Sequence, residues 1–456
     1  MKPQHIDTRH PLVKKLKNLY KSLFRHQSSA TATNLTYLSL AFLVFNACTS
    51  IYFSHKHLLR DLTDKCLNSF YYTMNESKIG CDDWMKTLVT MAVAMIPQHL
   101  SDYPILFVFD DSLIEKEGDS FEAKRHLFDH TAKNGSNYLD GHCFVTLLIM
   151  VPVLLGGKVE YISVPVAHRM WTGEQTKLEI AAELVMKAYT YADRPAQYIV
   201  LCDSWYPKGV VCDLNKIPNI SLICNVRVDT TIFSLPEKNV DEAPKRGRPP
   251  LVGDKIDIAT VPVVEVDGCD YNVGYVWVKT RLFGLKESVL AIVTEAKESK
   301  TRRLFLCTNP SACECFDASC FSDKKAVAFA MVDRMFIPLA IYCFRWAVEK
   351  LYFELKTFWN FREYKLRSKV GIERLVNLQM LTYALLSMLP HLDEDFRALT
   401  EMSMQERRYT LGRLIDQKLY FRDFRCDHRK WRKFESPRES LPTELSRGIG
   451  RVKNWK

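Results

Sequence analysis

The sequence predicts a multidomain α+β protein: a mixed sheet flanked by helices, interrupted by a mainly β insertion and preceded by a helical N-terminal domain. Apolar residues recur at helical spacing over residues 1–95, compact apolar runs typical of strands begin near residue 104, and long helical patterns return after residue 330. The chain has 456 residues, of which 47% are apolar. This is enough to bury a core in more than one domain, and it excludes disordered and fibrous classes.

The charge balance favours an anionic partner. Lys and Arg number 63 against 53 Asp and Glu, a formal net charge of +10, and nucleic acid is the first partner that this balance indicates. The 14 cysteines are scattered, which is typical of reduced thiols in an intracellular protein. The basic N-terminus lacks the apolar core of a signal peptide, so we expect a cytoplasmic protein.

One uncharged stretch, residues 35–53, has about the length of a membrane span. Polar residues run through it, and the chain has no second stretch of this kind. A buried helix capped at Thr33 or Asn34 explains the pattern more simply. We therefore expect no membrane partner.

The spacing of the apolar residues and the local composition divide the chain into five parts. These are a helical N-terminal region that we expect to bind DNA (1–95), the first part of a core (96–225), a β-rich insertion (226–330), a second part of the core that carries a long helix (331–390), and a basic C-terminal region (391–456).

The first part of the core reads as strand, hairpin, helix, strand. Apolar runs at residues 105–109, 142–153 and 159–164 predict three strands, a helical pattern covers residues 173–191, and residues 198–202 predict a fourth strand. This order predicts a mixed sheet with helices packed on it.

The insertion is predicted to be mainly β. Apolar runs typical of strands lie at residues 220–226, 260–266, 271–279, 288–294 and 303–307. A loop rich in proline and basic residues, 244–250, interrupts them.

Two of the core strands end on acids. The first runs into Asp110, Asp111 and Ser112, and the fourth runs into Asp203. A carboxylate at the end of a buried strand is held rigidly at the sheet edge, where it reaches solvent or a metal ion. Each acid alone is also explained as the cap of a turn, but the pair in a basic protein favours a functional site.

The predicted helix after residue 330 carries a mixed polar stripe. Pro338 suits its first turn, and Tyr342, Arg345, Glu349 and Lys356 follow at relative positions 0, 3, 7 and 14. At ~100° per residue these four positions fall within roughly a 60° arc of one helix face. The stripe is either a ladder of i, i+4 ion pairs or a functional site.

The spacing Tyr-x2-Arg-x3-Glu-x6-Lys resembles the signature of bacterial insertion-sequence DDE transposases with the YREK motif. Residues 109–112 (Phe-Asp-Asp-Ser) resemble the segment around the first catalytic Asp of that family, and residues 201–206 (Leu-Cys-Asp-Ser-Trp-Tyr) resemble the segment around the second. Ser112 stands where the family usually has Thr. Asp111 is preferred as the first acid because it directly precedes this hydroxyl position, and Asp110 is the alternate.

The resemblance spans residues 104–389 and implies a ribonuclease-H-like core. It implies that Asp111, Asp203 and Glu349 are catalytic and bind two Mg²⁺ ions, for which Mn²⁺ is a substitute. Arg345 and Lys356 are then expected to grip DNA phosphates beside the metals, with Tyr342 orienting one of those phosphates.

The activity implied is Mg-dependent cleavage and strand transfer at the ends of an insertion sequence. The implied partners are double-stranded DNA, both the terminal inverted repeats and the target, and a second copy of the chain, forming a homodimer on paired ends. The implied location is the bacterial cytoplasm, in association with the nucleoid. Two alternatives stay open: a ribonuclease-H-like DNA nuclease without strand transfer, and a non-catalytic DNA-binding relic of a transposase.

Two further segments are candidates for DNA contact. Arg246 and Arg248, in an Arg-Gly-Arg loop, resemble a hook for the minor groove of A·T-rich DNA, although a solvated loop explains them equally well. Arg169 and Trp171 are predicted to lie in a loop after the third strand, where they either approach DNA or pack against the core.

Overall fold

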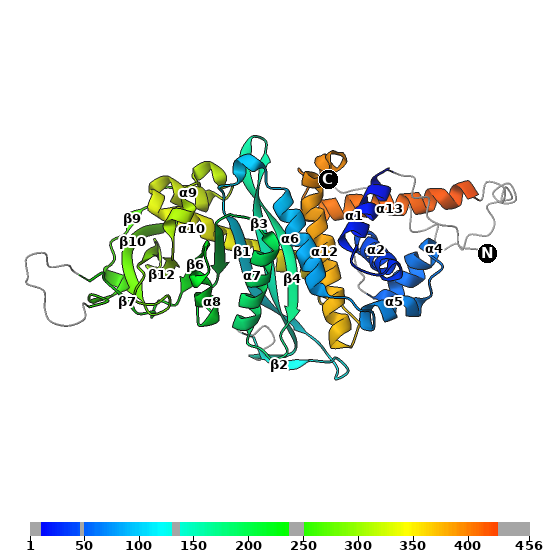
Figure 1. Cartoon of the computed structure of the whole chain (residues 1–456), viewed down its shortest axis with the longest axis horizontal. Coiled ribbons are helices and arrows are strands. Elements are labelled where there is room, and N and C mark those ends of the chain that lie inside the picture. Colours follow the sequence, from blue (N-terminus) through cyan, green and yellow to red (C-terminus); the bar gives the residue numbers. More distant parts are fainter. Residues whose placement is uncertain (1–10, 46–49, 130–136, 237–249, 427–456) are drawn as a thin grey trace, which may run out of the picture.

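The computed structural model describes residues 11–45, 50–129, 137–236 and 250–426. Figure 1 shows three regions along the long axis of the molecule. A helical region lies at one end, a large sheet flanked by helices occupies the middle, and the β-rich insertion lies at the other end. The predicted mixed α+β class is confirmed.

The core of the sheet is a block of five strands in the order β4-β3-β1-β5-β6. β3 is antiparallel to both of its neighbours, β4 and β1, whereas β1, β5 and β6 run parallel to one another. These five strands are β1 (Ile105–Glu115), β3 (Tyr138–Leu155), β4 (Lys158–Met170), β5 (Tyr198–Cys202) and β6 (Ile220–Val226). A short strand, β2 (Arg125–Phe128), pairs with the start of β3. The strand, hairpin, helix, strand order read from the sequence is therefore confirmed.

The insertion continues this sheet. β12 pairs antiparallel with β6, and β11, β10, β7 and β8 follow outward, with β9 pairing to β10. Their bounds are β7 (Ile232–Phe233), β8 (Lys255–Ile256), β9 (Val264–Glu265), β10 (Tyr271–Thr280), β11 (Val289–Ala296) and β12 (Arg302–Cys307). The strand predicted at 260–266 is mostly wrong, because only Val264–Glu265 pairs. Pro262 lacks the N–H that a longer ladder would need.

Two helices cover one face of the core strands. α6 (Cys81–Ala94) packs on β4 and on α7 (Lys177–Ala192), which also contacts β1 and β3 (Figure 1). α7 begins at a capping box in which the side chains of Thr176 and Glu179 each bind the other's backbone N–H. This cap fixes the position of Lys177, the first residue of the helix.

The helix predicted to carry all four polar residues is interrupted. α10 (Ile337–Tyr342) ends at Tyr342, a 3-10 turn covers Cys343–Arg345, and α11 (Trp346–Phe358) follows and contacts β1. The prediction of one continuous helix is therefore wrong, although Arg345 still pairs with Glu349 and lies 5.9 Å from the centre of the Tyr342 ring. The 3-10 turn winds at about three residues per turn, which shifts Tyr342 relative to Glu349 and Lys356.

Long α12 (Lys369–Leu392) runs beside β4 and links the sheet to the N-terminal helices. Among the described residues it is the one helix long and apolar enough to cross a membrane, and 89% of its most apolar window is buried inside the fold. Residues 375–392 of this helix carry no charge, so the expectation that the chain has no second uncharged stretch is wrong. In the uncharged stretch singled out above, residues 35–43 are buried in α2 and residues 46–49 lie outside the described ranges.

The remaining helices lie mostly in the N-terminal region. They are α1 (Pro11–Leu23), α2 (Ser29–Val44), α3 (Ile51–Ser54), α4 (Arg60–Leu62), α5 (Leu67–Asn75), α8 (Val210–Asp213), α9 (Lys324–Val332) and α13 (Met404–Cys426). α13 packs on α2, and its buried Arg408 donates hydrogen bonds to the carbonyls of Phe42 and Phe45. The C-terminal part of the chain thus closes back on the N-terminal helices.

Candidate active site

Asp110 and Asp203 meet where β1 and β5 run side by side. The parallel register pairs Val108 of β1 with Leu201 of β5. Asp110 lies two residues after Val108, still within β1, and Asp203 lies two residues after Leu201, just past the end of β5. In extended chain, residues two apart point to the same face of a sheet. The register therefore directs both carboxylates to one side of the sheet.

The Asp110 carboxyl lies in a poor environment for a charge. Burial, followed by the negative charges of Asp203 and Asp111, raises its pKa to about 7. Burial also raises the pKa of Asp203, although the backbone N–H of Trp205 donates to its carboxylate at 3.0 Å. Two desolvated carboxyls that repel each other are costly to fold, so a pair of this kind calls for a cation.

Arg345 supplies positive charge to this cluster. One guanidinium nitrogen lies 3.5 Å from Asp110 Oδ2, and another forms an ion pair with Glu349. The Arg345 side chain is 14% exposed and that of Glu349 is 34% exposed, so the pair is largely shielded from water. Arg345 thus joins the Glu on α11 to the acids of the sheet through the planar fork of its guanidinium.

Asp111 faces the other way. Tyr206 donates to its Oδ1 at 2.9 Å, and Lys177, at the start of α7, donates to its Oδ2 at 2.7 Å. The thiol of Cys143 also points at Oδ2, at 3.3 Å. Neighbouring strand residues point to opposite faces, so Asp111 belongs to the α7 side, whereas Asp110 belongs to the α11 side.

Two tyrosines fasten the α10–α11 segment to the strands. The Tyr342 hydroxyl donates to the carbonyl of Cys202 at 3.2 Å, and the Tyr352 hydroxyl donates to the carbonyl of Asp110 at 2.9 Å. Burial raises the pKa of both phenols, so both stay protonated donors. The structure therefore places Tyr342 as an anchor of the strand that precedes Asp203.

A groove of about 1110 Å³ opens at the carboxyl ends of β1 and β5. Asp110, Asp111 and Asp203 lie along it, together with Lys177 and Lys356. The Lys356 ammonium also lies 5.7 Å from the centre of the Tyr352 ring. The groove gathers four of the residues singled out in the sequence, and Glu349 borders the cluster through Arg345.

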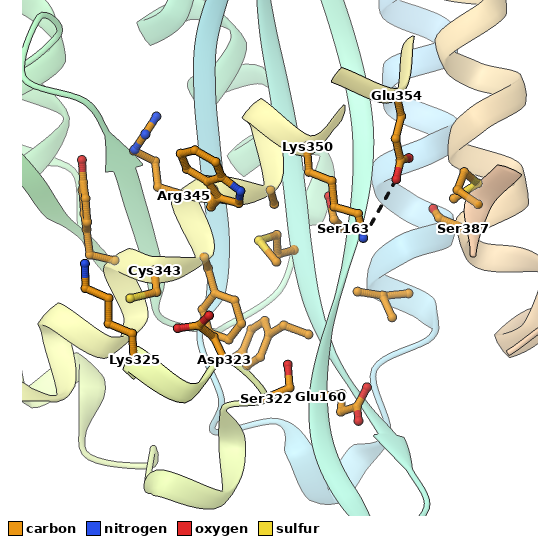
Figure 2. Close-up of a pocket in the computed structure, with 18 of the residues that line it drawn as sticks. Glu160, Ser163, Ser322, Asp323, Lys325, Cys343, Arg345, Lys350, Glu354 and Ser387 are labelled. Atoms are coloured by element: carbon orange, nitrogen blue, oxygen red, sulfur yellow. Dashed lines mark ion pairs between the residues drawn. The ribbon is translucent and has the colours of Figure 1, made fainter. Parts of the chain in front are cut away.

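A second cavity, of about 960 Å³, has Arg345 among the residues that line it. Figure 2 shows Arg345 and Cys343 on its wall, with Lys350 and Glu354 of α11 facing Ser163 and Ser387. The Lys350 ammonium is 4.0 Å from the Glu354 carboxylate. Arg345 therefore lines this cavity and also contacts Asp110, which lies in the acid groove.

The donor set of the groove is all carboxylate, which suits a hard divalent cation. Asp110 and Asp203 fit that demand, since each is desolvated and Asp110 is further destabilised by the charge of Asp203. Glu349 is held by Arg345 instead. Within the described ranges, no group of three or more His, Cys, Asp or Glu side chains is arranged to hold a metal ion.

The other DNA-contact candidates are distributed as follows. Arg246 and Arg248 lie outside the described residues. Arg169 lies in β4 rather than in a loop, and it pairs with Asp82 and Glu373. Trp171 follows directly after β4 and stays partly exposed. Arg169 and Trp171 thus both keep a partly exposed side chain.

Sequence reasoning missed Lys177 and Trp205 as parts of the groove. Lys177 directly follows the pattern Thr176-x-x-Glu179, a capping-box signature that marks the first residue of a helix. Trp205 lies inside the segment around Asp203. Both signals were readable, although only the fold brings the two side chains together.

Comparisons with known proteins leave the family of the chain open. No protein-family model matches the sequence, and no curated protein matches it. Among solved structures, the chain is similar to the cryo-EM structure of a piggyBac transposase synaptic complex with hairpin DNA. The TM-score is 0.40 and the identity 12%, over 97% of this chain and 82% of that chain.

Proposed function

We propose that the protein is a DDE transposase of the insertion-sequence type, which cleaves DNA at the ends of its element and transfers the cut strand. The observation that carries this proposal is the partly buried cluster of Asp110, Asp203, Arg345 and Glu349, which lies where the parallel strands β1 and β5 run side by side. The strand order β4-β3-β1-β5-β6 supports the ribonuclease-H-like core that the sequence resemblance implies.

Within this proposal the first catalytic acid is Asp110. The sequence favoured Asp111 because it precedes Ser112. The strand register and the bonds of Asp111 to Tyr206 and Lys177 support the alternate. Asp110, Asp203 and Glu349 are therefore the proposed catalytic acids.

These residues suit an in-line displacement at a phosphodiester. Asp110 and Asp203 would hold Mg²⁺, with Mn²⁺ as a substitute, and Glu349 would join them by exchanging its ion pair with Arg345 for the metal. Two such ions would activate the attacking oxygen and stabilise the leaving oxygen. Arg345 and Lys356 present positive charge to the non-bridging phosphate oxygens. Tyr342 holds the backbone at Cys202, next to Asp203, and Tyr352 holds the backbone at Asp110.

The proposed partners follow from the reaction. They are the terminal inverted repeats of the element, target DNA, and a second copy of the chain that holds the paired ends. The helical N-terminal region, Arg246 and Arg248 are proposed DNA contacts, and the proposed location is the bacterial nucleoid.

The test is a Mg²⁺-dependent cleavage and strand-transfer assay on DNA that carries the sequences flanking the reading frame. Wild type is compared with Asp203→Ala and with Asp213→Ala, a matched control whose carboxylate pairs with Lys216 at the surface. We expect cleavage and joining in wild type and in the control, and neither in Asp203→Ala. Cleavage without joining would assign a nuclease, and binding without cleavage would assign a relic.

A further inference from the structure

The groove that holds the acids continues into a row of alternating cations and indoles. The order is Arg125, Trp171, Lys177, Trp205, Lys208, and each member contacts the next. The guanidinium of Arg125 lies 4.9 Å from the centre of the Trp171 ring, and the Lys177 ammonium lies 5.6 Å from that ring. The ammonium groups of Lys177 and Lys208 lie 5.5 Å and 5.0 Å from the centre of the Trp205 ring.

The row is assembled from three distant parts of the chain. Arg125 comes from β2, Trp171 and Lys177 flank the turn between β4 and α7, and Trp205 and Lys208 come from the segment after β5. The fold therefore builds this row beside the acids, and no local sequence pattern accounts for it.

Several contacts hold the cations in place. Arg125 donates to the carbonyl of Thr172. Gly173 makes room for its guanidinium, because a Cβ at Gly173 would lie 2.4 Å from Arg125 Nη1. Asp111 fixes Lys177 by the 2.7 Å ion pair described above. Positions fixed in this way cost little entropy when a ligand binds.

The row is nevertheless accessible. Arg125 and Lys208 are exposed, and Trp205 is 40% exposed. Asp111 forms an ion pair with Lys177. It does not pair with the other two cations of the row, Arg125 and Lys208. The row thus offers positive charge at successive points together with indole surface, which matches phosphates spaced along a strand with unpaired bases between them.

We infer that Arg125, Lys177 and Lys208, held by Trp171 and Trp205, form a binding track for the backbone of one unpaired DNA strand that enters or leaves the acid groove. Asp111 is a positioning residue of this track, because it orients Lys177. The inference rests on the proposed function for its choice of DNA, and it assigns a separate role to the α7 side of the groove.

The test is the salt dependence of binding to fluorescein-labelled single-stranded oligothymidine, measured by anisotropy with the full chain in EDTA so that no cleavage occurs. Each phosphate contact on a single strand adds about 0.7 to the slope of log affinity against log salt. We expect Arg125→Ala/Lys208→Ala to lower this slope by about 1.4 and the affinity by about tenfold at low salt.

The matched control removes the same charge elsewhere. Lys158→Ala/Lys300→Ala replaces two exposed lysines, one at the hairpin between β3 and β4 and one in the turn between β11 and β12. This control should leave the slope unchanged. Trp205→Ala, which removes no charge, should weaken binding severalfold at an unchanged slope. An unchanged melting temperature shows that a variant is folded.

An unaltered slope in the Arg125/Lys208 variant, an equal loss in the control, or a loss confined to duplex DNA of the same sequence would overturn the track. These outcomes are separable from the catalytic proposal. Cleavage by a wild type whose track variants bind normally refutes the track alone. If the wild type never cleaves DNA but the Arg125/Lys208 variant has the lower salt slope of binding, the catalytic proposal is refuted and the track is supported.

Discussion

Asp110 and Asp111 are neighbours in sequence, and their side chains lie in opposite environments. Asp110 faces Asp203 and the guanidinium of Arg345, and its pKa is raised to about 7. Asp111 receives hydrogen bonds from Lys177 and Tyr206 on the α7 side. Because successive side chains of a β-strand point to opposite faces, Asp110 lies where its negative charge is poorly compensated, whereas the charge of Asp111 is compensated by Lys177.

The comparison teaches that a carboxylate in a groove is not by itself a candidate catalyst. What distinguishes Asp110 is the cost of holding its charge beside Asp203, because a divalent cation relieves that cost. Asp111 has the Lys177 ammonium in contact at 2.7 Å, whereas the nearest guanidinium nitrogen to Asp110 is 3.5 Å away and belongs to Arg345, which also pairs with Glu349. The predictions below separate these two roles.

The largest effect is expected on the α11 side. Glu349→Gln should lower the cleavage rate by about 10³-fold or more, because the residue belongs to a group of acids that acts as a unit. Affinity for the element ends should change little. Single-turnover cleavage measures the rate and anisotropy measures the affinity, both on the same DNA. Normal cleavage by this variant would show that Glu349 is not part of the catalytic site.

The next effect concerns the fork of Arg345. Arg345→Lys should lower cleavage by about 100-fold, because one ammonium cannot contact Asp110 and Glu349 as the guanidinium does. Lys350→Ala, on the exposed side of α11, is the matched control and should retain full activity. Equal activity of Arg345→Lys and wild type would show that bridging is unnecessary.

These expectations mark how far the sequence reaches. The core strands could be predicted from apolar runs and turn residues, because buried strands need apolar side chains and tight turns need particular residues. The choice between Asp110 and Asp111 needed the pairing of Val108 with Leu201, which is a long-range fact. The 3-10 turn at Cys343–Arg345 left no recognisable trace in the sequence, and it interrupts the predicted continuous helix.

The stability of the protein should depend on pH through Asp110. Its pKa is about 7 in the folded protein, whereas the ordinary pKa of an Asp side chain is 3.8, so between these two pH values the folded state holds a proton that the unfolded state has lost. Stability therefore falls as pH rises from about 4 to 7. In EDTA at pH 8, Asp110→Asn should raise the free energy of unfolding by up to about 4 kcal/mol.

Urea unfolding at pH 5 and pH 8 checks this sign. Asp213→Asn, at the surface, should show no gain at pH 8. A destabilised Asp110→Asn at pH 8 would mean that Arg345 already compensates the charge of Asp110.

The smallest effects should come from the tyrosines that serve the two acids. Tyr352→Phe and Tyr206→Phe each remove one hydroxyl donor, so each should cost about 1 kcal/mol of stability. Tyr352→Phe should also slow cleavage severalfold, because it loosens the backbone at Asp110, whereas Tyr206→Phe should leave cleavage unchanged. A reversed pattern in kcat would place the reacting group on the α7 side.

The most direct test sets Asp110→Asn beside Asp111→Asn in one single-turnover cleavage assay at saturating Mg²⁺. With Asp110 as the first catalytic acid, Asp110→Asn loses about 10³-fold or more, while Asp111→Asn stays within about tenfold of wild type. Full loss in Asp111→Asn with activity retained in Asp110→Asn would contradict the assignment of the two faces.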